Sequence, residues 1–153
     1  MTGVRHFTAS AIVLDGSERV LLVHHRKAGV WLYPGGHIDS DEDPAQAAMR
    51  EVVEETGVHA AIITESAFDH PAVTSHPVPF AIIEMDVSDS RVGAHRHIDM
   101  IYVARATTDS VSAQLAEVSA ARWTPAADVL SLETPSELPA LIERATRWAK
   151  ART

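Results

Sequence analysis

The chain contains no cysteine among its 153 residues, which excludes disulfide bonds and thiolate metal sites. Long apolar runs are also missing, since none approaches the roughly 20 residues that a membrane-spanning helix needs. The stretch MTGVRHFTASAIVLDGSERV at the start alternates in character and carries an acidic turn, which is not the pattern of a signal peptide. These absences lead us to expect a cytoplasmic protein without a membrane segment.

Basic residues are in short supply, because 13 Lys and Arg stand against 21 Asp and Glu, for a formal net charge of −8. Proteins that bind long nucleic acids contact the phosphates through stripes of basic side chains. The charge balance therefore disfavours nucleic acid as a partner, while a small phosphate compound that arrives with a metal ion remains compatible. The sequence leaves open whether the chain acts alone or as a homodimer.

What is present is a series of apolar strands with a few helices between them. The 46% hydrophobic and 22% charged content is ordinary for a globular protein, and the length fits one domain over residues 1–153. Strands are predicted at 5–14, 19–25, 59–64, 78–87, 97–106 and 118–125, and helices at 44–56, 126–131 and 136–150. This order predicts an α/β fold in which helices flank a mixed β-sheet.

The helix predicted at 44–56 has signals at both of its ends. Asp41 or Asp43 can cap its start, Pro44 suits the first turn, and Gly57 can end it in a left-handed conformation. We expect its buried side to consist of Ala45, Ala48, Met49, Val52 and Val53.

Three glutamates, Glu51, Glu54 and Glu55, lie on one face of the last turns of this helix. Like charges at such spacing repel by roughly 0.2–0.5 kcal/mol per pair, and the negative end of the helix dipole adds to the cost. Carboxylate oxygens are hard ligands that suit Mg²⁺ or Mn²⁺, and a bound cation would remove the repulsion. The residues therefore predict a divalent cation site, although a solvated acidic face is the alternative on spacing alone.

The glutamates belong to a longer frame: Gly36, five residues, Glu42, seven residues, Arg50-Glu51-Val52, one residue, Glu54-Glu55, one residue and Gly57-Val58. This frame resembles the Nudix box at every specified position. Seven fixed residues would coincide by chance on the order of 10⁻⁹ per starting position. The preceding WLYPGG at 31–36 is also similar to the Nudix family, and Asp39, where many relatives have Glu, is a conservative departure. The resemblance implies the Nudix α/β/α sandwich.

The resemblance also implies an activity and roles for the box residues. Glu54 and Glu55 would be the principal metal ligands, and Glu51, oriented by Arg50, would bind metal or activate the attacking water. With Mg²⁺, or Mn²⁺ in its place, such an enzyme hydrolyses a phosphoanhydride bond in a small nucleoside diphosphate derivative. The alternative is a catalytically silent nucleotide-binding or sensor module, but such relatives typically lose box glutamates.

Three further residues take their expected roles from the same resemblance. Gly36 would let the backbone approach the site and offer its carbonyl to the metal. Glu42 would tie the preceding loop to the helix through Arg50. Glu117, six residues before Trp123, resembles an additional family glutamate that supplies a metal ligand or the catalytic base, although a lone loop glutamate is usually just solvated.

Side chains outside the box are candidates for contacting the substrate. Trp31 and Phe68 can stack on a base, and Arg26, at the end of the second strand, can contact phosphate or ribose. His97 shares a strand face with Asp99 and can hydrogen-bond a phosphate. The plainer alternatives are core packing for the two aromatic residues, a solvated strand end for Arg26 and a His97–Asp99 pair. The sequence does not identify the substrate.

Overall fold

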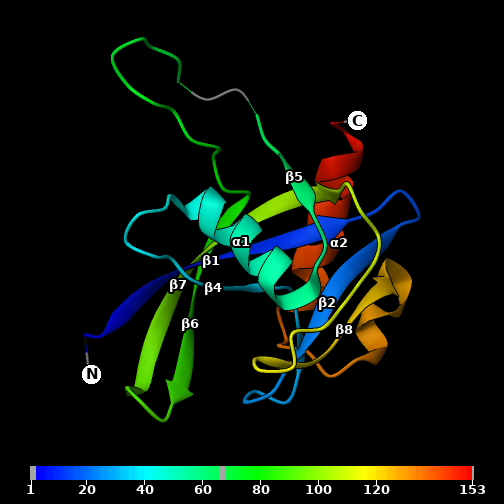
Figure 1. Ribbon diagram of the computed structural model, residues 1–153. Coiled ribbons are helices and arrows are strands. Elements are labelled where there is room, and N and C mark those ends of the chain that lie inside the picture. Colours follow the sequence, from blue (N-terminus) through cyan, green and yellow to red (C-terminus); the bar gives the residue numbers. More distant parts are fainter. Residues whose placement is uncertain (1–2, 66–67, 153) are drawn as a thin grey trace.

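Two α-helices cover opposite faces of a mixed sheet in the computed structural model, which describes residues 3–65 and 68–152 (Figure 1). The helices are α1 (Pro44–Thr56) and α2 (Leu138–Lys150), and a 3₁₀ helix, η1 (Ala126–Ser131), precedes α2. The strands are β1 (Arg5–Leu14), β2 (Arg19–His25), β3 (Trp31–Leu32), β4 (Gly35–His37), β5 (Ala60–Ile63), β6 (Ala81–Asp89), β7 (Gly93–Ala106) and β8 (Val118–Pro125).

The sheet is mixed because β1 and β7 run parallel, in register from Arg5 opposite Arg96 to Leu14 opposite Arg105. The other strand pairings among the described residues are antiparallel. The main strand order is β3-β2-β1-β7-β5, with β4 paired to β1, β6 to β7 and β8 to β2. The predicted α/β class and mixed sheet are therefore confirmed.

Strand β1 lies at the centre of the core and is buried on both faces. Its side chains alternate, so Ala9, Ala11 and Val13 pack on the α1 side, while Ile12 and Leu14 pack on the α2 side. A strand covered by helices on both faces needs a near-continuous apolar run, which is what the sequence provides here.

The ends of α1 follow the predicted chemistry. Asp43 is the N-cap, and its carboxylate accepts from the Gln46 amide at 2.9 Å while the Gln46 side chain accepts from the Asp43 amide at 3.0 Å. Gly57, with φ of 73°, donates its N–H to the Val53 carbonyl, as expected for a left-handed C-cap. One expectation was wrong: Val53 is 37% exposed, and Ala47 is buried instead.

Some strand boundaries differ from the predicted ones. Strands β6 and β7 form a hairpin that extends to Asp89 and Gly93, beyond the apolar stretches 78–87 and 97–106. The Asp89 carboxylate closes the turn by accepting from the amides of Arg91 and Val92. Polar residues form the end of this hairpin, so an apolar pattern does not reveal it. Within the described part of the chain, no helix has the length and apolar character to cross a membrane.

Candidate active site

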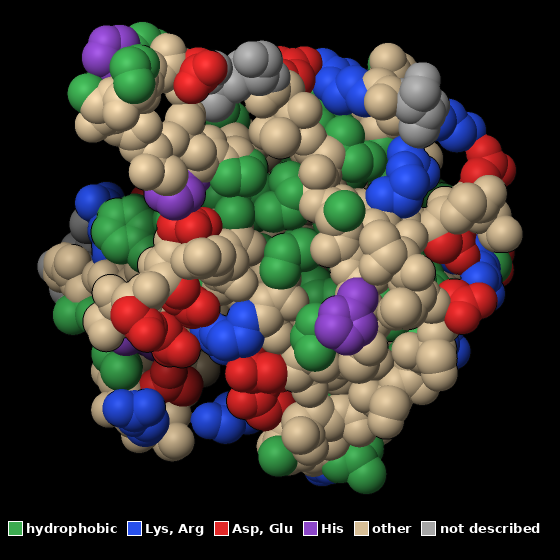
Figure 2. All heavy atoms as spheres, turned by 45° about the horizontal axis from the view of Figure 1, so that its top comes forward, with side chains coloured by type: hydrophobic (Ala, Val, Ile, Leu, Met, Phe, Trp, Pro, Cys, Tyr) green, Lys and Arg blue, Asp and Glu red, His purple; other side chains and the backbone are tan. Residues whose placement is uncertain are grey.

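Three carboxylates meet next to β4, with oxygen atoms that all lie within 4.8 Å of one another. Glu51 and Glu55 come from α1 and are almost fully buried, at 8% and 4% exposure, while Glu117 precedes β8 and is exposed. The structure therefore brings together two of the three box glutamates and the outlying Glu117. Acidic side chains also gather over α1 and the loop before it, with basic ones among them (Figure 2).

The loop between β7 and β8 brings Glu117 to the site by docking on the end of α1. The last carbonyls of a helix have no partners within the helix and must find them elsewhere. Two loop amides serve here: Ser112 donates to the Thr56 carbonyl at 2.8 Å and Gln114 to the Glu55 carbonyl at 3.0 Å. The same contacts that complete the helix end thus position the third carboxylate.

Glu55 has the most unusual environment of the three. Its Oε2 atom is buried and makes no hydrogen bond to any residue that the structure describes. Burial, followed by the negative charge of Glu51, raises the pKa of Glu55 to about 8, and burial also raises the pKa of Glu51. Buried polar atoms almost always have partners, so an unpartnered carboxylate oxygen beside two other carboxylates fits a hard divalent cation.

Arg50 holds the acidic groups around the site in place. Its guanidinium forms a two-pronged pair with Glu42, with Nε and Nη2 donating at 3.0 and 2.6 Å. Nη1 donates to Glu51 and to Glu54, both at 3.1 Å, and Nη2 also reaches the His37 carbonyl at 3.0 Å. The predicted contacts of Arg50 with Glu42 and Glu51 are confirmed. Glu54, half exposed, faces Arg50 rather than the other carboxylates.

Replacing Arg50 with lysine is expected to destabilise the protein by about 1–3 kcal/mol and to lower any turnover, because an ammonium cannot reproduce the fork of hydrogen bonds. Urea unfolding measures the first effect. Arg147→Lys is the matched control, since Arg147 is exposed on α2 with only a 4.0 Å ion pair to Glu143, and it should change stability by less than about 0.5 kcal/mol. Equal stability of the Arg50→Lys variant and wild type would contradict this role.

Gly36 lies against the Glu51 carboxylate. A Cβ atom at this position would lie 2.5 Å from Oε1 of Glu51, closer than non-bonded atoms approach. Any side chain here would displace the Glu51 carboxylate or β4, so glycine allows the close approach that was expected.

The predicted substrate contacts are placed around the site without converging on the carboxylates. Arg26 donates from Nε to the Leu115 carbonyl at 2.7 Å and so holds the loop that carries Glu117. Trp31 packs in the core on the α2 side, with the Arg122 guanidinium 4.4 Å from its ring centroid. Phe68 is 71% exposed. Contacts of these side chains with substrate stay predictions.

The expected His97–Asp99 pair is wrong. Asp99 is buried and accepts hydrogen bonds from Thr8, Ser10 and Tyr33, at 3.0, 2.9 and 3.4 Å. His97 instead faces His95, with 3.2 Å between their Nε2 atoms. Sequence reasoning missed the β1 partners because they follow from the register of β1 and β7; the only signal was that residues 6, 8 and 10 share a strand face.

Comparison with known proteins places this chain in a family. The model of the NUDIX domain matches residues 4–145. A candidate 8-oxo-dGTP diphosphatase of Bacillus subtilis (strain 168) is 44% identical over 54 residues, which cover 35% of this chain and 36% of that protein. An RNA pyrophosphohydrolase of Brucella ovis is 52% identical over 40 residues, which cover 26% of this chain and 22% of that protein. The chain thus spans well under half the length of these curated relatives.

The similarity in three dimensions extends over nearly the whole chain. The crystal structure of a NUDIX-family hydrolase from Clostridium perfringens superimposes with a TM-score of 0.83 at 27% identity, covering 95% of this chain and 99% of that one. Together with the domain match, this shows that the chain belongs to the Nudix family.

Proposed function

We propose that this chain is a metal-dependent hydrolase that cleaves a phosphoanhydride bond in a small nucleoside diphosphate derivative, with Mg²⁺ as its metal and Mn²⁺ as a substitute. The observation that carries this proposal is the cluster of Glu51, Glu55 and Glu117, which contains a buried carboxylate oxygen without a partner. The names of the Bacillus and Brucella relatives, a diphosphatase and a pyrophosphohydrolase, support the same reaction class.

Glu51, Glu55 and Glu117 would hold the metal, with the Gly36 carbonyl and Glu54 as further ligands if Glu54 leaves Arg50. The bound ion supplies charge neutralisation at the phosphates and lowers the pKa of the attacking water. Glu51 is our candidate for the general base, because burial raises its pKa above the ordinary value of a carboxyl while Arg50 fixes its carboxylate. Glu117 is the alternative base, since its carboxylate reaches the same cluster.

The substrate is expected to be small. The net charge of −8 does not suit a long polyanion, so an RNA 5′ end is a weaker candidate than a free nucleotide. A cation bound by the glutamates would supply positive charge for the phosphates of a small substrate. We also propose a cytoplasmic location. Sedimentation measurements would show whether the chain forms a homodimer.

A release assay over a panel of nucleotides tests the proposed reaction. The panel comprises 8-oxo-dGTP, the common NTPs, dinucleoside polyphosphates, ADP-ribose, nucleotide sugars and a 5′-triphosphorylated RNA. We expect turnover of at least one small nucleotide with Mg²⁺ or Mn²⁺ and none after chelation. The absence of turnover with every compound and both metals would overturn the proposal.

The same panel distinguishes the enzyme from a nucleotide sensor. A sensor would bind one of the nucleotides tightly in calorimetry and leave it intact after long incubation with metal. An RNA-processing enzyme would instead prefer the RNA and show a steep salt dependence of binding.

A further inference from the structure

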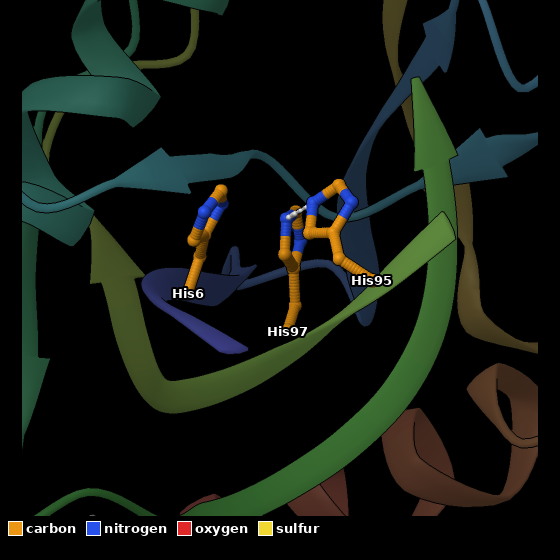
Figure 3. A group of neighbouring side chains, drawn as sticks. All are labelled: His6, His95 and His97. Carbon is orange, nitrogen blue, oxygen red and sulfur yellow. Dashed lines mark hydrogen bonds between the residues drawn. The ribbon is translucent and has the colours of Figure 1, made fainter. Parts of the chain in front are cut away.

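Three histidines project from the same face of the sheet, near the start of β1 and β7 (Figure 3). His6 lies directly opposite His97 in the parallel β1–β7 register, and His95 precedes His97 by two residues, so all three share one face. One nitrogen from each ring lies within 4.8 Å of the others. The ring centroids are 4.7 Å apart for His6–His95, 5.0 Å for His95–His97 and 6.0 Å for His6–His97.

We propose that His6, His95 and His97 form a second metal site, separate from the glutamate cluster, that binds Zn²⁺ through imidazole nitrogens. Tetrahedral Zn²⁺ with Zn–N bonds of about 2.05 Å places two ligand nitrogens about 3.3 Å apart. The Nε2 atoms of His95 and His97 are already 3.2 Å apart. Two of the three ligands therefore stand at the required spacing, and a small movement of His6 completes the set.

The hydrogen bonds of His95 hold its second nitrogen, Nε2, against His97 (Figure 3). The His95 side chain is fully buried, and its Nδ1 lies 2.8 Å from the Gly93 carbonyl. A carbonyl only accepts, so Nδ1 carries a proton, and in this tautomer Nε2 accepts the hydrogen bond from Nε2–H of His97. An ion bound to both Nε2 atoms would replace that hydrogen bond, with the His97 proton moving to its Nδ1. A second ring nitrogen bonded to a backbone carbonyl is the arrangement that orients metal-bound histidines. Oδ2 of Asp89, 3.9 Å from this Nε2, adds negative charge nearby.

The surroundings of the other rings also suit an ion. Nε2 of His37, on β4, lies 3.3 Å from Nδ1 of His6. This hydrogen bond from the adjacent strand orients the His6 ring. His6 and His97 are only half-buried, which gives an ion access from solvent.

The two clusters should select different ions. Oxygen ligands such as those of Glu51, Glu55 and Glu117 suit Mg²⁺, whereas imidazoles bind Zn²⁺ far better than Mg²⁺. An excess of Mg²⁺ would therefore occupy the glutamates and leave the histidines to Zn²⁺.

Equilibrium dialysis of the full chain against Zn²⁺, in excess Mg²⁺, tests the site. We expect one Zn²⁺ per chain for wild type and for Glu55→Gln, and binding weaker by at least about 100-fold for His6→Gln and His97→Gln. His70→Gln is the matched control, because His70 lies in an exposed loop, stacked on Phe68. Co²⁺ gives a second readout, since a four-coordinate imidazole site absorbs visible light more strongly than an octahedral oxygen site.

Three results would overturn the proposal: no Zn²⁺ retained in excess Mg²⁺, equal Zn²⁺ binding by wild type and both histidine variants, or a loss of Zn²⁺ in Glu55→Gln alone. Because His95 is buried, replacing it risks unfolding the chain. The test therefore uses variants of the two half-buried ligands, His6 and His97. Circular dichroism checks that His6→Gln and His97→Gln remain folded. Zn²⁺ binding is measured separately for each variant, so one folded variant is enough for the test.

Discussion

Replacing Glu55 with glutamine is expected to lower turnover by at least about 100-fold, because the change removes a ligand charge from the proposed metal site and leaves its shape intact. Glu55 is the carboxylate whose buried Oε2 has no hydrogen-bond partner among the described residues, so this oxygen is available to an ion. The measurement is kcat with saturating Mg²⁺ on whichever substrate the panel identifies. Glu143→Gln is the control, since Glu143 is an exposed glutamate on α2 and its replacement should leave kcat unchanged.

The same assay ranks the two candidates for the general base. Glu51→Gln should lose more turnover than Glu117→Gln, while His97→Ala should lose the least, because Glu51 alone is both buried and fixed by Arg50. Wild-type kcat in Glu55→Gln would remove that residue from the metal site. A loss in Glu117→Gln that exceeds the loss in Glu51→Gln would place the base on the loop.

The fold was largely predictable because its buried elements carry continuous apolar patterns. The apolar stretch from Ala9 to Leu14 lies within the predicted strand 5–14, and capping residues marked both ends of α1. The two-residue β3, the three-residue β4 and the polar end of the β6–β7 hairpin were not predictable in this way. Pairing with neighbouring strands, rather than local sequence, makes them strands.

Only the part of the site that lies on α1 was predictable from the sequence. At 3.6 residues per turn, Glu55, Glu51 and Glu54 lie about 60°, 100° and 160° from Val52, the centre of the buried stripe. This explains why Glu55 and Glu51 turn inwards and Glu54 faces outwards, although all three lie on one side of the helix. Glu117 and the histidine cluster depend on loop docking and on strand register, so no local pattern could place them.

Without divalent metal, the protein is expected to lose stability as the pH rises from about 4.5 to about 8, through the titration of Glu55. The folded state raises the pKa of this carboxyl to about 8, against an ordinary value of 4.5. Between these values the folded chain holds a proton that the unfolded chain has released, so unfolding becomes easier as the pH rises. The effect is absent below about pH 4.5, where both states are protonated, and complete above about pH 8. Over this range the loss should amount to a few kcal/mol.

Bound metal should reverse this dependence, because Mg²⁺ binds the deprotonated carboxylates and binds them better as the pH rises. Histidines whose pKa is lowered in the fold, such as His97, contribute the opposite slope below their ordinary value of 6.5, so the window from about pH 6.5 to 8 isolates the glutamate. Urea unfolding in this window, with chelator and with saturating Mg²⁺, measures both slopes. In chelator, the stability of Glu55→Gln should fall much less with pH than that of wild type. At pH 8 it should match or exceed wild-type stability, since the repulsion from Glu51 is gone. Parallel pH curves for wild type and Glu55→Gln would show that Glu55 titrates normally and would remove the physical basis for the metal site.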